Sequence, residues 1–92
     1  MMEELFEKWL KDNLNVSENT IGKYKRALNA VSKDMIEEGV IDKNIYSIVS
    51  SIEFEQVREK ILDNTFFQKK DTRGNRMYSV AMKHYSDFLR SR

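Results

Sequence analysis

The sequence contains no cysteine and no proline, and it has only three glycines, Gly22, Gly39 and Gly74. The absence of cysteine excludes disulfide bonds and thiolate metal sites. Because proline and glycine are the residues that interrupt helices, their scarcity favours helices joined by short turns. Long apolar runs are also missing, since no stretch approaches the ~20 residues that a membrane span needs. The acidic, amphipathic start MMEELFEKWL is neither a signal peptide nor a transit peptide, and we therefore expect a cytoplasmic protein.

Apolar residues make up 40% of the 92-residue chain and charged residues 34%, which is a globular composition. A chain of this length has room for one hydrophobic core. Residues 1–92 are therefore predicted to form a single domain.

The net charge of +1 conceals an alternation of charge along the chain. Residues 21–36 carry four bases and one acid, and residues 65–92 carry seven bases and two acids. Acids outnumber bases in residues 1–20 and 37–64. Segregated basic segments suit a polyanionic partner, but alternating charge also keeps a helical bundle in solution, and both interpretations stay open here.

Apolar residues recur at helical spacing in four segments of the chain. Helices are predicted over residues 2–13, 18–38, 51–64 and 75–90. One short helical turn is predicted within residues 42–49, for which Asp42 is a candidate cap. Before the last helix, Phe66 and Phe67 are expected in the core and the stretch QKKDTRGN in an external loop. No strand pattern competes, so the predicted fold is all-α, a compact bundle of four main helices plus a short helical turn.

Several helix ends are marked by residues that bind free backbone groups. Ser17 is predicted to accept a hydrogen bond from a backbone N–H of the second helix. Gly39 has the position of the residue that ends this helix. Ser50 and Glu53 have the spacing of a capping box at the start of the third helix.

One side of the second helix carries residues that suit an anionic partner. At 100° per residue, a column separate from the apolar face consists of Gly22, Arg26, Asn29 and Lys33, with Lys23 beside it. Glycine lowers helix propensity by up to ~1 kcal/mol, and the close approach of a phosphate near the start of the helix is one reason to keep it. Packing of Gly22 against a neighbouring helix is the alternative explanation.

The last helix carries a second set of cations. Arg76 and Lys83 are seven residues apart on the side opposite the apolar stripe, and the predicted loop before them is also basic. Single outward cations are often only solvated, but cations mixed with short polar side chains are the groups that contact a phosphate backbone. The candidate DNA-binding residues are Thr20, Gly22, Lys23, Arg26, Asn29, Lys33, Lys69, Lys70, Arg73, Arg76, Ser79 and Lys83.

The sequence contains few residues in an arrangement that suits catalysis. His84 is the single histidine and lies at the edge of an apolar face, which favours a structural role. No P-loop or glycine-rich phosphate cradle is present, and no carboxylate pair has a histidine at ligand spacing. The tyrosines have core spacing and are expected to pack with their hydroxyls at the rim. We therefore predict a protein that is not an enzyme and that uses no cofactor or metal.

Three segments carry a resemblance to a known family. They are FEKWL at residues 6–10, VSENTIGKYKRAL at residues 16–28 and NRMYSVAMKHYSDFL at residues 75–89. The second contains the run Thr-x-x-x-Tyr-x-x-x-Leu. In this order they resemble the SAM-like, core-binding N-terminal domain of phage integrases and other tyrosine recombinases. Similar modules precede some restriction endonucleases.

This resemblance implies a DNA clamp in which the 18–38 helix and the closing helix lie against the duplex. Carried over residue by residue, it points to Thr20, Lys23, Arg26, Arg76, Ser79 and Lys83. The family's catalytic domain is not present in these residues, so Tyr78 and Tyr85 inherit no catalytic role. We therefore expect a non-catalytic domain that binds double-stranded DNA, as in the N-terminal clamp of a phage-type integrase or a restriction endonuclease.

A second function stays open from the sequence. Residues 37–64 carry seven acids and three bases, which offers carboxylates to a basic groove on another protein. On that interpretation the chain is a stand-alone protein-interaction module, such as a phage or mobile-element inhibitor of a nuclease or recombinase.

Overall fold

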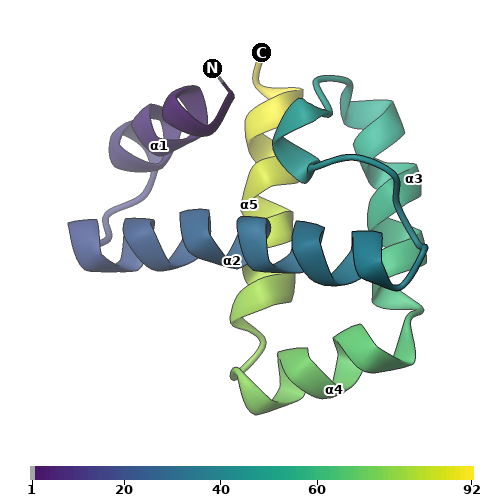
Figure 1. Cartoon of the computed structure of the whole chain (residues 1–92). Helices are drawn as coiled ribbons and strands as arrows, with labels where there is room; N and C mark the ends of the chain where they lie inside the picture. The colour runs from purple at the N-terminus through teal and green to yellow at the C-terminus, as the bar shows by residue number, and fades with distance from the viewer. Residues whose placement is uncertain (1) are drawn as a thin grey trace.

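The computed structural model describes residues 2–92, which form five α-helices and one 3₁₀ turn (Figure 1). In chain order these are α1 Met2–Asn13, α2 Glu18–Glu37, η1 Ile45–Ser47, α3 Ser51–Leu62, α4 Thr65–Arg73 and α5 Met77–Arg90. No strand occurs within the described range. The predicted all-α class is confirmed, but the helices number five rather than four because the predicted loop before the last helix is itself helical.

The predicted caps mark both ends of α2. The Ser17 hydroxyl accepts a hydrogen bond from the Thr20 backbone N–H at 3.2 Å. At the other end Gly39 has a left-handed φ of 74°, and the backbone N–H that follows it donates to the Met35 carbonyl at 2.9 Å. Because an L side chain is strained at this φ, glycine is the residue that suits the end of this helix.

The start of α3 is also capped as predicted, whereas the cap of η1 is not. The Ser50 hydroxyl accepts a hydrogen bond from the Glu53 N–H at 3.2 Å. In η1 the Asn44 side chain accepts the Tyr46 N–H at 2.8 Å, so Asn44 rather than Asp42 is the cap. The short turn therefore begins two residues later than its candidate cap indicates.

The helix α4 takes in all but the last two residues of the predicted loop QKKDTRGN. The Asn64 side chain caps its first turn by accepting the Phe67 N–H at 2.9 Å. Phe67 is buried as expected, but Phe66 is 46% exposed, so its predicted place in the core is wrong. The other buried residue of α4 is Asp71. Buried positions of an amphipathic helix ordinarily carry apolar residues, so this carboxylate interrupts the pattern by which a helix is predicted.

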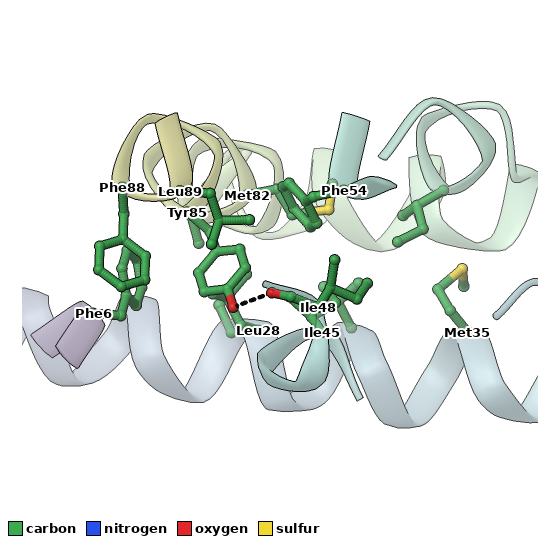
Figure 2. Packing of buried hydrophobic residues seen from close by; sticks show 14 of the residues in the cluster. Phe6, Leu28, Met35, Ile45, Ile48, Phe54, Met82, Tyr85, Phe88 and Leu89 are labelled. Atoms are coloured by element: carbon green, nitrogen blue, oxygen red, sulfur yellow. Dashed lines mark hydrogen bonds between the residues drawn. The ribbon is translucent and has the colours of Figure 1, made fainter. Parts of the chain in front are cut away.

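An aromatic cluster around Tyr85 fills the centre of the core (Figure 2). The Tyr85 ring meets Phe6 and Phe54 edge-on, with centroids 5.3 and 5.1 Å away. Its hydroxyl donates to the Ile48 carbonyl at 2.9 Å and is buried, so the predicted place of this hydroxyl at the rim is wrong. Burial raises the pKa of Tyr85 to about 12. One side chain thus joins α1, α3, α5 and the segment after η1.

The crossing of α2 over α5 organises the molecule (Figure 1). Ile21, Leu28 and Met35 of α2 are buried against the rest of the fold. The domain is a slab of 33 × 28 × 17 Å, whose short dimension holds about two layers of helices, since a helix is ~10 Å wide. The outer side of α2 therefore belongs to one of the two broad faces. No helix within residues 2–92 is both long and apolar enough to cross a membrane.

Candidate nucleic-acid interface

The contacts of α2 define which of its sides is free. Tyr24 faces α5, where its ring centroid lies 5.1 Å from that of His84. Lys25 faces α1 through an ion pair with Glu7, and Asp34 faces α4 through an ion pair of its own. At 100° per residue, one arc of α2 remains, opposite α5. Its exposed cations are Lys23, Arg26 and Lys33.

An ion pair places α4 beside this arc. The Lys70 ammonium lies 2.6 Å from an Asp34 carboxylate oxygen, and the two helices run side by side in opposite directions (Figure 1). Arg73 is three residues beyond Lys70 and so lies on the same side of α4, whereas Lys69 is turned further outward. Lys69 and Arg73 are exposed and help to line an open depression of about 440 Å³. The cations of α2 and α4 therefore share one side of the slab.

Most of the predicted cations have no ionic partner among the described side chains. Lys70 pairs with Asp34, and the Lys83 ammonium lies 3.5 Å from an Asp87 oxygen. Six of the predicted cations are exposed and form no ion pair within residues 2–92, namely Lys23, Arg26, Lys33, Lys69, Arg73 and Arg76. Outside the predicted set, Lys60 and Arg92 are also exposed and without an ion pair in this range. Most of the exposed cations without an ion pair in the described chain are thus predicted DNA-binding residues.

The structure does not bring the two predicted basic columns onto one side. On α5, His84 faces α2, and Ser86 faces α3, where its hydroxyl donates to Glu55. Lys83 is exposed on the remaining side of α5, away from both helices. Arg26 lies on the side of α2 that is turned away from α5. The columns of Arg26 and Lys83 therefore occupy opposite broad faces of the slab.

The corner between α4 and α5 holds two further predicted residues. Arg76 is exposed and has a left-handed φ of 63°, next to Asn75 at 56°. The Ser79 N–H donates to Asp71 Oδ1 at 2.9 Å, and its hydroxyl donates to the Arg76 carbonyl at 3.1 Å. Both donors of Ser79 are therefore satisfied within the corner.

Gly22 is covered by a side chain of its own helix. A Cβ atom at this position would lie 3.0 Å from Nη1 of Arg26, and the next nearest atoms belong to the same guanidinium. Packing against a neighbouring helix is therefore not the reason for this glycine. Arg26 folds back along α2 and lies over the bare backbone.

Asn29 and Thr20 also have partners inside the domain. The Asn29 amide donates to Glu3 at 3.3 Å and its oxygen accepts from Asn44 at 3.3 Å, on the side of α2 that faces α1 and η1. The Thr20 hydroxyl lies 3.1 Å from the Ser17 hydroxyl in the first turn of α2. These two predicted residues thus stabilise contacts within the chain.

The acidic segment 37–64 is partly neutralised within the domain. Glu53 pairs with Lys43 at 2.8 Å, and a Glu55 oxygen lies 3.4 Å from Arg58. These pairs leave fewer carboxylates for a basic partner.

His84 lies half-buried between α2 and α5, as a structural histidine would. Burial lowers its pKa, the Lys83 ammonium lowers it further, and the Asp87 carboxylate opposes them. Within residues 2–92, no group of three or more histidine, aspartate or glutamate side chains is placed to hold a metal ion.

The helices α1 and α2, the turn η1 and the first part of α3 match a known family. The sequence agrees with the phage integrase SAM-like domain over residues 2–57, which is more than half of the chain. The chain belongs to this family. No curated protein and no solved structure matches it. The matched part of this SAM-like domain contains the cations of α2 and ends before α4 begins.

Two residues that shape this surface of the SAM-like domain are missing from the predicted set. Asp34 holds Lys70, and Tyr78 lies beneath the Lys70 ammonium, 5.3 Å from it to the ring centroid. The one sequence signal for Asp34 is that it is the single acid in the basic segment 21–36. Tyr78 has no such signal, because it has the spacing of a core residue.

Proposed function

We propose that this SAM-like domain binds double-stranded DNA, without catalysing a reaction, by contacting the phosphate backbone with the outer sides of α2 and α4. The observation that carries the proposal is a set of exposed cations, without ion pairs in the described chain, on two adjacent helices. They are Lys23, Arg26 and Lys33 on α2, and Lys69 and Arg73 on α4. Membership of the phage integrase SAM-like family supports a role connected with DNA recombination.

Electrostatics favours phosphates at this surface. A cation with no carboxylate partner neutralises a phosphate without first breaking an ion pair, and each neutralised phosphate releases condensed counterions. Arginine adds several donors in a fixed fork that matches phosphate oxygens. The broad face measures 33 × 28 Å, which is comparable with one turn of B-DNA at ~34 Å. Binding through this face is expected to be strong at low salt and largely independent of sequence.

The test compares cations on the two broad faces. We expect Arg26→Ala/Arg73→Ala to weaken binding to all duplex sequences alike. It should also reduce the slope of log K against log[salt] by about 1.8, at ~0.9 for each phosphate that is no longer neutralised. Lys83→Ala is the matched control, because Lys83 is exposed on the opposite face and lies beside Asp87. Fluorescence anisotropy of a labelled duplex at several salt concentrations measures the affinity and the slope.

Unchanged affinity in the double variant would overturn the proposal. A greater loss in Lys83→Ala than in the double variant would place the duplex on α5 instead. The replaced side chains are exposed, so thermal melting by circular dichroism should show that all variants stay folded.

A further inference from the structure

A junction of three helices lies within the proposed DNA-binding surface. Lys70 of α4 contacts Asp34 of α2 at 2.6 Å, and its ammonium lies 5.3 Å from the ring centroid of Tyr78 of α5. Both a carboxylate and the face of an aromatic ring attract an ammonium. Tyr78 in turn lies against Gly74, where a Cβ atom would come within 2.9 Å of the ring. One lysine thus links all three helices.

We infer that the Asp34–Lys70 pair positions α4 against α2, and that Lys70 is a positioning residue rather than a phosphate ligand. This inference rests on the proposed DNA-binding function of the surface. It separates Lys70 from Lys69 and Arg73, which are exposed and have no ion pair within the described chain. The sequence alone treats these three cations as equivalent.

Partial burial distinguishes this ion pair from an ordinary surface pair. The Lys70 side chain is 32% exposed and the Asp34 side chain 19%, so water screens their attraction less than at the open surface. Binding of a phosphate by the Lys70 ammonium would compete with its contacts to Asp34 and Tyr78. The exposed cations on either side of it have no such contacts to break.

The helix α4 also packs against α3 and α5, but within residues 2–92 the Asp34–Lys70 pair is its one polar side-chain contact with α2. The helix is nine residues long, and its buried residues are Phe67 and Asp71. A helix this short is marginal on its own, so packing and ion pairs must hold it in place. Since Arg73 follows Lys70 by three residues on the same side, a rotation of α4 moves Arg73 relative to Arg26. The Asp34–Lys70 pair therefore sets the spacing between the cations of the two helices.

The substitution Asp34→Asn distinguishes the positioning of α4 by the ion pair from the effect of the Asp34 charge on DNA binding. The substitution removes a negative charge from the proposed DNA-binding face, so binding would tighten if charge alone mattered. If the pair positions α4, binding should weaken about three- to tenfold, which is the size of coupling between residues in direct contact. Glu37→Gln is the matched control, because Glu37 is exposed on α2 and has no ion pair within residues 2–92. That variant should bind DNA slightly more tightly.

Two substitutions of equal charge separate the roles of the α4 cations. Arg73→Met should reduce the slope of log K against log[salt] by about 0.9. Lys70→Met should lower the affinity but change this slope by clearly less than Arg73→Met does, because Lys70 itself neutralises no phosphate. Lys70→Arg keeps the ion pair with Asp34 and should restore most of the affinity.

Amide hydrogen exchange of the free domain tests positioning without DNA. Asp34→Asn and Lys70→Met should accelerate exchange in α4, and Glu37→Gln should not. Tighter DNA binding by Asp34→Asn, or unchanged exchange in α4, would overturn the inference. Failure of the unmodified domain to bind DNA would overturn the proposed function instead, and the exchange comparison would still decide whether the pair positions α4.

Discussion

Tyr85 combines tight packing with one specific polar contact. Besides the rings of Phe6 and Phe54, it contacts those of Tyr46 and Phe88, whose centroids each lie 5.6 Å from the centroid of the Tyr85 ring. The carbonyl that its hydroxyl reaches belongs to Ile48, which is 1% exposed. A buried carbonyl that loses its donor is left without compensation. The hydroxyl therefore matters to stability as well as the ring.

Tyr85→Phe should lower the free energy of unfolding by about 1–2 kcal/mol, because the Ile48 carbonyl loses its donor. Urea denaturation followed by circular dichroism measures the change. Tyr24→Phe is the matched control, since no hydrogen bond of the Tyr24 hydroxyl occurs within residues 2–92, and it should change stability by less than ~0.5 kcal/mol. Equal losses in the two variants would contradict the importance of the buried hydrogen bond.

At the scale of elements, helices with an apolar stripe and a local cap were predictable. The start of α2 at Ser17 and its end at Gly39 depend on interactions between residues close in sequence. The pattern of residues in the sequence therefore predicts both helix ends. The helix α4 was not predictable in this way. Its stability depends on Phe67 and on Asp71, whose partner is the N–H of Ser79 in the next helix. A contact between elements leaves no periodic signal in either of them.

Asp71 supplies the cap that α5 lacks in its own sequence. The N-cap residue Arg76 makes no side-chain capping bond, and Asp71 Oδ1 accepts the Ser79 N–H instead. Asp71→Ala should lower the free energy of unfolding by about 1–2 kcal/mol and accelerate amide exchange in the first turn of α5. Asp71→Asn keeps the acceptor oxygen and should lose less. Equal effects of the two substitutions would show that the cap contributes little.

At the scale of the whole molecule, the sequence predicts which cations point away from the core, but it does not predict which of them lie on the same face. A helical wheel correctly places Arg26 and Lys83 away from the core. It contains no information on how two helices cross, and the crossing of α2 over α5 puts these cations on opposite faces. The sequence also assigns Lys69 and Arg73 to a loop, so their alignment with α2 depends on α4 and its ion pair.

The crossing of α2 and α5 also makes the stability of the fold sensitive to acid. Burial beside Tyr24 lowers the pKa of His84 below its ordinary value of 6.5. The neutral imidazole therefore stabilises the fold above pH 6.5, and this contribution is lost as the pH falls through the lowered pKa. We expect the thermal midpoint to fall between pH 7 and pH 5, before most carboxylates titrate. His84→Gln should flatten this part of the profile, and an equally steep profile in that variant would contradict a role for His84.

The place of Arg26 over Gly22 bears on how far the domain can reach toward a ligand. The Arg26 side chain is exposed and forms no ion pair within residues 2–92, so its guanidinium can move out into solvent. Rotation about its side-chain bonds extends the charge by several ångströms while the helix stays still. A side chain at position 22 would crowd the guanidinium, because even a Cβ atom there would lie 3.0 Å from Nη1 of Arg26. Because Gly22 has no side chain, the Arg26 guanidinium can either lie along α2 or extend away from it.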